Sequence, residues 1–391
     1  MRLEVTAAER TFRQEVQDWL RSNVPRTRRP LSGLGVRDFD TAWQRAQNEG
    51  GWAGISWPKE YGGRGLSLAQ QLIWYEECAK ANAPVGGAMF VALTHAGPTL
   101  IVRGSEQQKA FHLPRMLKGD AVWCQGFSEP NAGSDLAGLK TTGRIEGDEI
   151  VVNGSKIWTS YADMSDYQEL LIRTDPTAAK HKGLSWVICD MKLPGITIHK
   201  IPTASGTGNL CQVFYDEVRI PISAVVGDLH DGWNVSMTTL GFERGTAFAA
   251  HQVALAETVE KLIKIASQIP GPNGHRRAID DDAIAERLAM LRADVAALRA
   301  ITLLSVSRGM VQQVPGPEGN IVALYYAELS KKVYAMAVEL QGAEGIEKKP
   351  AAPRDWLTEY LDSFKNTIAG GSSQIRRNII GERLLGLPRA K

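Results

Sequence analysis

The chain has 391 residues, of which 43% are hydrophobic and 23% are charged, and its formal net charge is +2. This composition is typical of a globular protein with large buried cores and room for two or three domains. The scattered basic residues argue against a nucleic-acid partner, and no apolar stretch has the length of a membrane span.

The N-terminal residues and the cysteines bear on the cellular compartment. Residues 1–5 run into charged, helix-like sequence and lack the apolar core of a signal peptide. The cysteines Cys78, Cys124, Cys189 and Cys211 are far apart and fit neither a zinc site nor a disulfide scaffold. We therefore expect a cytoplasmic protein without a structural metal.

The first 120 residues are predicted to form a helical domain. Apolar and charged residues recur at helical spacing in residues 9–20, 39–48, 68–81 and 105–117. Ser105 precedes the last of these segments, with Gln108 three residues later, which is the pattern of a capping box. A glycine-rich run at residues 62–65 separates two of the helices.

The pattern becomes β-like from about residue 121 to about residue 230. Residues 150–152 and 156–158 flank Asn153-Gly154, which predicts a hairpin with a two-residue turn. Residues 169–173 and 184–190 also read as strands. We expect a mainly β domain inserted between helical ones.

Helical spacing returns from about residue 232 onward. Leu288, Leu291, Val295 and Leu298 alternate spacings of three and four residues, as the packing helices of a bundle do. This pattern predicts a helical bundle that ends near Leu387.

The most informative segment covers residues 123–135, Trp-Cys-Gln-Gly-Phe-Ser-Glu-Pro-Asn-Ala-Gly-Ser-Asp. Pro130 fixes one backbone angle, and Gly133 allows the chain to approach a ligand without a side chain in the way. Ser128, Ser134 and free backbone N–H groups can donate hydrogen bonds. The segment therefore indicates a binding loop for a polar, planar molecule.

This segment, with residues 156–158 after it, resembles the flavin and acyl-thioester seat of the acyl-CoA dehydrogenase family. The order helical, β, helical extends the resemblance over essentially the whole chain. The resemblance implies an α+β fold with an N-terminal helical domain (1–120), a central β-barrel-like domain (121–230) and a C-terminal four-helix bundle (231–391). It also implies FAD as cofactor and an acyl-CoA substrate that becomes a 2,3-enoyl-CoA when a carboxylate removes the α-proton and the flavin takes a hydride.

The resemblance assigns cofactor contacts by position. Phe127, Ser128 and Ser134 match positions that line the flavin, the nucleotide or the substrate, and Trp158 and Ser160 match groups that pack on the isoalloxazine. The family usually has Thr in place of Ser128 and of Ser160, and the hydroxyl is kept. Any one of these residues alone is better explained by core packing or turn capping, but the whole set in its spacing favours the site.

The family's usual base lies near the C-terminus, in a segment that here covers residues 370–377. Gly370 stands at the position of the carboxylate and cannot accept a proton. Ser372 and Gln374 still suit the flavin side of the segment, through a hydroxyl and backbone amides at a helix start.

A subset of the family, the isovaleryl- and long-chain-type enzymes, carries its base on a C-terminal-domain helix just before an Arg. Here Glu243 and Arg244 stand at that place. The resemblance therefore implies Glu243 as the base, with Arg244 and Ser134 contacting the substrate. The alternative is an exposed helix glutamate, but the usual base is missing and a carboxylate stands at the known alternative position. We expect burial beside an apolar acyl chain to raise the pKa of Glu243 toward neutrality.

Two segments that hold a neighbouring subunit's FAD in the family are altered. The Arg-x-x-Phe-Gly stretch is replaced by a segment with Arg276 and Arg277 but no Phe-Gly, and the Gly-Gly-x-Gly turn carries Ala343 and Glu344. A carboxylate near phosphates is unfavourable unless it points away. Two interpretations stay open, sequence drift with an arginine still in contact, or dependence on a homologous partner chain that completes the clamps.

The resemblance implies an electron-transferring flavoprotein as acceptor and a dimer or tetramer, built from this chain alone or with a homologous acyl-CoA dehydrogenase chain. The base position suggests a branched or bulky acyl group, such as a steroid side chain or another polycyclic thioester. Two other functions stay open, a non-catalytic structural subunit of a mixed oligomer and a flavin oxidase or monooxygenase. A nicotinamide enzyme is disfavoured, since no Gly-x-Gly-x-x-Gly links a strand to a helix.

Overall fold

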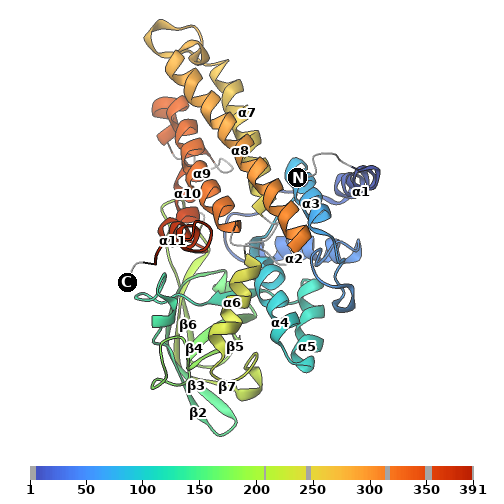
Figure 1. The fold of residues 1–391 in the computed structure, drawn as a ribbon, viewed down its shortest axis with the longest axis vertical. Helices are drawn as coiled ribbons and strands as arrows, with labels where there is room; N and C mark the ends of the chain where they lie inside the picture. The colour runs from blue at the N-terminus through green and yellow to red at the C-terminus, as the bar shows by residue number, and fades with distance from the viewer. Residues whose placement is uncertain (1–5, 207, 244–247, 313–317, 348–354, 390–391) are drawn as a thin grey trace.

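The computed structural model describes residues 6–206, 208–243, 248–312, 318–347 and 355–389. A helical domain, a curled β-sheet and a group of long helices follow one another along the chain (Figure 1). The predicted α+β class, with helices on both sides of a central β domain in sequence, is confirmed.

The N-terminal helices are α1 (Ala7–Asn23), α2 (Leu34–Glu49), α3 (Leu68–Lys80), α4 (Gly97–Arg103) and α5 (Glu106–Leu117). A π-helix, η3 (Ala92–Ala96), leads directly into α4. The capping box of α5 is confirmed, because the Ser105 hydroxyl accepts from the Gln108 N–H at 3.2 Å and the Gln108 side chain accepts from the Ser105 N–H at 3.0 Å.

The central strands are β1 (Trp123–Gly126), β2 (Thr142–Glu146), β3 (Glu149–Ser160), β4 (Tyr167–Arg173), β5 (Leu184–Asp190), β6 (Ile196–Lys200) and β7 (Leu210–Pro221). They form one sheet in the order β1-β4-β2-β3-β7-β6, with β5 paired to β4. Alternate residues face two cores: Leu171 and Trp186 pack toward the helical domain, whereas Leu170 and Val187 lie in the core on the other face.

The hairpin predicted at Asn153-Gly154 is wrong. Strand β3 runs through both residues with a shift in register to β7, and the turn lies at Gly147, whose φ is +63°. The Asn153 side chain donates to Glu217 on β7 at 2.6 Å and accepts from its N–H at 3.0 Å, which supports a bulge instead of a turn.

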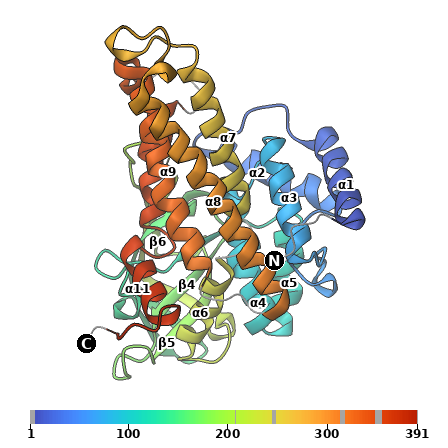
Figure 2. The same ribbon diagram turned by 45° about the horizontal axis from the view of Figure 1, so that its top comes forward.

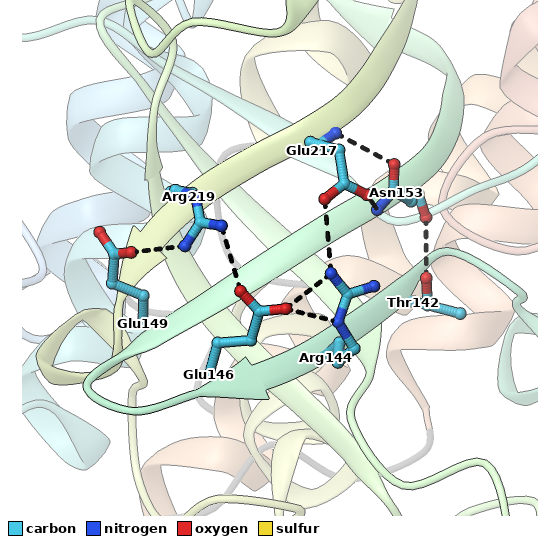
Figure 3. A network of polar contacts seen from close by, with 7 residues as sticks. All are labelled: Thr142, Arg144, Glu146, Glu149, Asn153, Glu217 and Arg219. Atoms are coloured by element: carbon cyan, nitrogen blue, oxygen red, sulfur yellow. Dashed lines mark hydrogen bonds and ion pairs between the residues drawn. The ribbon is translucent and has the colours of Figure 1, made fainter.

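Polar side chains of β2, β3 and β7 form a row of contacts on the solvent side of the hairpin that joins β2 to β3, as Figure 3 shows. Arg144 and Arg219 each bind Glu146, and Arg219 also binds Glu149 at 2.9 Å. Exposed ion pairs of this kind contribute little stability each, so the row of contacts marks this face as a solvated one.

The later helices are α6 (Gly232–Glu243), α7 (Phe248–Ala266), α8 (Asp282–Gln312), α9 (Gly319–Gln341), α10 (Trp356–Ser363) and α11 (Ser373–Arg383). Helices α7, α8 and α9 pack together and rise away from the sheet, and α11 lies where they meet it (Figures 1 and 2). The predicted core positions are confirmed, since Leu288, Leu291 and Leu298 are buried and Val295 packs against them.

Two arginines around the buried Glu76 carboxylate link helices α1 and α3 to helix α8. Arg13 on α1 binds Glu76 on α3 at 2.9 Å, and Arg299 on α8 binds the same carboxylate.

In the part of the chain that the structure describes, no helix is long and apolar enough to cross a membrane.

Candidate functional site

The predicted binding loop is fixed to strand β3 by a buried ion pair. The Lys156 ammonium donates to the Phe127 carbonyl at 3.1 Å and to the Glu129 carboxylate at 2.9 Å. The same carboxylate accepts from the backbone N–H groups of Lys140 and Thr141 at 2.7 and 2.8 Å. The Lys156 and Glu129 side chains therefore hold the loop at its start, through Phe127, and at the segment that follows it, through Lys140 and Thr141.

Burial and charge act in opposite directions on this pair. Burial lowers the pKa of Lys156 to about 8, although the Glu129 carboxylate favours the ammonium. Burial also disfavours the Glu129 carboxylate, but the Lys156 charge and the hydrogen bonds from Thr141 and Lys140 outweigh it and keep the pKa of Glu129 below its ordinary value. The opposite charges and the hydrogen bonds thus offset part of the cost of burying this pair, in which the Lys156 side chain is 0% exposed.

Trp158 lies two residues after Lys156 and is not a core residue. Its φ is +62°, in the left-handed region that bulky residues rarely adopt, and the register between β3 and β7 shifts at this point. The side chain is 57% exposed. A strained backbone that presents a large aromatic ring to solvent is typical of a ligand contact.

The residues next to Trp158 connect it to the binding loop. The Ile157 N–H donates to the Ser128 carbonyl at 2.9 Å, which ties the backbone of the loop to the strand that carries the indole. Ser128 and Ser160 are half-buried. An exposed indole beside half-buried hydroxyl groups fits a flat ring with a polar edge.

Phe127 and Ser134 do not lie with the exposed indole of Trp158 and the half-buried hydroxyls of Ser128 and Ser160. Phe127 is buried in the core beneath the sheet, and its carbonyl is the group held by Lys156. Ser134 is exposed in the turn after Gly133. An open cavity of about 410 Å³ lies beside the loop, but its lining, which includes Asn131, Thr141 and Phe214, contains none of the predicted site residues.

The second predicted segment forms the start of α11. Gly370 and Gly371 have φ values of +64° and +97°, and the Ser372 hydroxyl caps the helix by accepting from the Ile375 N–H at 3.3 Å. Arg376 is buried and donates to three backbone carbonyls, which fixes the turn against α9; these carbonyls belong to Ala323, Asn366 and Ala369.

Gln374 is exposed in the first turn of α11. The amides of this first turn and the capping Ser372 hydroxyl lie at the positive end of the helix dipole. The segment can therefore donate to a polar or anionic group, but at Gly370 it offers no carboxylate.

Helix α6 carries the other predicted catalytic residue at its end. Its start lies close against β5, because a side chain at Gly232 would collide with the backbone of Ser185. Farther along, the hydroxyls of Thr239 and Thr99 lie 2.9 Å apart, both fully buried. This contact fixes the α6 backbone against α4 one turn before Glu243.

Glu243 is the last residue of α6, and its side chain is outside the described part of the structure. Arg244 lies outside the described residues altogether. The structure therefore gives the backbone position of Glu243 and leaves the roles of Glu243 and Arg244 as predictions.

The two altered clamp segments are both at the surface. Arg277 binds Asp280 at 2.5 Å, and Arg276 is exposed beside it. Gly342 begins a 3-10 helix (Gly342–Ile346) in which Glu344 is exposed. Arg277 is thus engaged within its own chain.

Glu129 and Lys156 are the residues that sequence reasoning missed. A lysine directly before Ile157 and Trp158 in a predicted strand was the available signal, since a lysine that is buried needs a partner. The partner could not be identified from the sequence, because it lies 27 residues away on another segment.

Comparisons with known proteins agree along the whole chain. The acyl-CoA dehydrogenase N-terminal, middle and C-terminal domain families match residues 6–120, 124–218 and 230–385. Acyl-CoA dehydrogenase IpdE1 of Mycobacterium tuberculosis is 37% identical over 385 residues, which cover 97% of each chain. IpdE1 of Mycolicibacterium smegmatis is also 37% identical, with the same coverage of each chain.

Two solved structures are similar over the full length of both chains. The Tcur3481-Tcur3483 steroid ACAD has a TM-score of 0.86 at 32% identity. The ChsE4-ChsE5 complex from Mycobacterium tuberculosis has a TM-score of 0.85 at 30% identity. Each of these names joins two differently named chains, and ChsE4-ChsE5 is called a complex.

Proposed function

Because this chain belongs to the acyl-CoA dehydrogenase family, we propose that it oxidises the Cα–Cβ bond of a bulky, polycyclic acyl-CoA with Glu243 as the base. The chain is an oxidoreductase of a family whose cofactor is FAD. One observation carries the choice of base: the usual base position holds Gly370, which has no carboxylate, whereas helix α6 ends in a carboxylate residue, Glu243.

The residues of this chain fit a flavin. Trp158 would contact the flat ring, and the Ser128 and Ser160 hydroxyls would bond its polar edge. The start of α11, with Ser372 and Gln374, would donate to another polar part of the cofactor. When bound, the flavin supplies the acceptor for the β-hydrogen as a hydride.

Glu243 would remove the α-proton of the thioester. Helix α6 supports this role because its apolar side packs into the core through Val235, with Leu240 against the same core. A carboxylate at the end of such a helix, beside an apolar acyl group, is favoured as a base by desolvation. Ser134 and Arg244 would contact the thioester or its CoA, as their positions in the family motif imply.

The variant Glu243→Gln tests the base. We expect turnover to fall by about 10²- to 10⁴-fold, the usual contribution of a general base, with flavin absorbance retained. Glu286→Gln, on the exposed side of α8, is the matched control. Bleaching of the flavin by a panel of acyl-CoA thioesters measures both; near-normal bleaching in Glu243→Gln would favour a non-catalytic subunit or another base.

We also propose that the working unit contains a second, homologous chain. Arg277 is engaged by Asp280, and Glu344 stands in the turn that would approach a neighbour's phosphates. The Tcur3481-Tcur3483 and ChsE4-ChsE5 structures support this arrangement. A homologous chain would supply the complete Arg-x-x-Phe-Gly stretch and the Gly-Gly-x-Gly turn that are altered in this chain.

Flavin counting tests the second chain. We expect little FAD in the chain expressed alone and more after co-expression with a homologous acyl-CoA dehydrogenase chain. One FAD per chain in the protein purified alone would contradict this. Transfer of electrons to an electron-transferring flavoprotein, with no hydrogen peroxide released during turnover, would separate a dehydrogenase from an oxidase.

A further inference from the structure

The loop between β4 and β5, residues 174–183, meets the turn that follows the predicted binding loop at the Arg173 guanidinium. This group donates to the Ala137 carbonyl of the turn at 2.7 Å and to the Lys180 carbonyl at 3.1 Å. Its other terminal N–H group donates to the Lys182 carbonyl at 3.4 Å. One half-buried arginine therefore joins the backbone of the β4–β5 loop to the backbone of the turn.

The β4–β5 loop places positive charge beside the predicted substrate contact Ser134. The Lys180 ammonium binds the carboxylate of Asp135, the next residue after Ser134, at 2.6 Å, and the two side chains are 52% and 64% exposed. Lys182 is also exposed, as is Lys140 after the same turn. An ion pair as exposed as this one contributes little stability. Lys180 can therefore exchange the Asp135 carboxylate for another anion without disturbing the fold.

The β4–β5 loop is held in shape by contacts of its own. The His181 ring packs edge-on against Trp233 in the first turn of α6, with the ring centroids 4.6 Å apart. The Asp175 N–H donates to the Gly183 carbonyl at 3.0 Å, which closes the loop at its base. The Asp175 carboxylate accepts from the Thr177 N–H at 2.8 Å and from its hydroxyl at 2.7 Å. The loop's own carboxylate is thus engaged by a neighbouring threonine.

We propose that Lys180 and Lys182 bind the phosphate groups of the acyl-CoA, and that the ion pair between Lys180 and Asp135 opens when they do. This inference rests on the proposed oxidation of an acyl-CoA, whose thioester or CoA part Ser134 would contact. The phosphates of CoA carry more negative charge than the single carboxylate of Asp135, and lysine ammonium groups bind phosphate as point charges. The exchange therefore favours the phosphates over Asp135.

The test uses the FAD-loaded enzyme with its partner chain and two matched thioesters. These are 3-cyclohexylpropanoyl-CoA and the same acyl group on pantetheine, which has no phosphate. We expect Lys180→Ala/Lys182→Ala to lower kcat/KM for the CoA thioester by about 5- to 30-fold at low salt, and to leave kcat/KM for the pantetheine thioester unchanged. A preference for the CoA thioester that the double variant leaves unchanged would overturn the proposal.

Lys261→Ala/Lys264→Ala is the matched control. Both lysines are exposed on α7, away from the β4–β5 loop, and their removal changes the net charge by the same amount. This control should leave the preference between the two thioesters unchanged. An equal loss of preference in the control would show a general effect of net charge and would also overturn the proposal.

Asp135→Asn distinguishes an exchange of anions from a purely structural ion pair. If Asp135 competes with phosphate for Lys180, its neutralisation should lower KM for the CoA thioester by about 2- to 5-fold, and KM for the pantetheine thioester should not change. If the ion pair only holds the turn that carries Ser134, KM for both thioesters should rise. That result, or an unchanged KM for the CoA thioester, would contradict the exchange.

Calorimetric binding of free CoA and of pantetheine separates this inference from the proposed function. If neither thioester bleaches the flavin, the proposed reaction fails, but CoA binding that Lys180→Ala/Lys182→Ala weakens would still support the phosphate site. CoA that binds the unaltered enzyme and the double variant with equal affinity, or that binds neither, would contradict it.

Discussion

The Lys156 ammonium and the Glu129 carboxylate lie 2.9 Å apart in the protein interior and join the two segments that carry the proposed flavin-binding residues. Glu129 organises the loop that begins at Phe127, and Lys156 precedes Trp158 by two residues on β3. The ion pair therefore sets the distance between the loop and the exposed indole before any ligand arrives. Such preorganisation is what a site for a rigid, flat cofactor requires.

Lys156→Met should destabilise the protein and loosen FAD together. The change leaves the Glu129 carboxylate buried without its counter-charge, and breaking a buried pair in this way costs ~3–5 kcal/mol. Urea unfolding and FAD titration measure the two effects. The double variant Lys156→Met/Glu129→Gln should be less destabilised than the sum of the single variants, because the charges are removed together; strict additivity would contradict the coupling.

Glu129 should also make stability depend on acid pH. Its folded pKa lies below the ordinary value of 4.5, so the folded state favours the ionised form. The stabilisation is therefore complete above about pH 4.5 and is lost as pH falls through the folded pKa. Unfolding free energies of the natural chain and of Glu129→Gln should converge as pH is lowered, and a constant difference across this range would refute the assignment.

Trp158→Ala should weaken FAD binding without unfolding the chain. The indole is 57% exposed, so its removal deletes little core packing. An aromatic contact contributes ~0.5–1.5 kcal/mol beyond area burial, which predicts at least a several-fold rise in the FAD dissociation constant. Fluorescence titration measures this constant, with Trp158→Phe retaining most of the affinity.

Phe111→Ala provides the control for the loss of an exposed ring. Phe111 is 51% exposed on α5, outside the proposed site. We expect no change in the FAD dissociation constant of this variant. An equal loss of affinity in both alanine variants would mean that Trp158 has no special contact with the flavin.

Thr239→Val should lower kcat more than it raises KM. The hydroxyl contact with Thr99 fixes α6 one turn before Glu243, and its loss costs about 1 kcal/mol of stability. A small shift of the helix end misplaces a base that must approach the α-proton closely. Steady-state kinetics and thermal unfolding of Thr239→Val measure the two effects, with Thr239→Ser as the conservative control. An unchanged kcat in Thr239→Val would show that Thr239 does not position the base.

Periodicity predicted most of the fold because it reports which side of an element is buried. The helices and the strands at residues 167–173 and 184–190 follow from that signal. The hairpin prediction at Asn153-Gly154 was wrong because this dipeptide is typical of a tight turn. In the structure, the hydrogen bonds between Asn153 and Glu217 keep both residues of the dipeptide within β3. Tertiary hydrogen bonds outweighed the local preference of the dipeptide.

The residues of the proposed site that follow a family motif, such as Ser128, Trp158 and Ser372, could be named from the sequence, and their contacts with a flavin stay predictions. The buried contact between Gln125 and Glu169 could not be predicted, because these residues are 44 positions apart and meet through the parallel pairing of β1 with β4. No local pattern reports a parallel pairing of distant strands. Glu243 stays a prediction that rests on its place in the sequence and at the end of α6.

The π-helix before α4 also bears on how this core can diverge. One residue turns an α-helix by about 100°, so deleting the codon of Ala96, which lies between His95 and α4, would turn His95 relative to α4 by roughly that angle. The imidazole would then leave Gln125 and Glu169, whereas the Thr99–Thr239 contact would persist. A lineage could thus exchange a buried polar contact for an apolar one by a change in length, with every residue of the proposed site left in place.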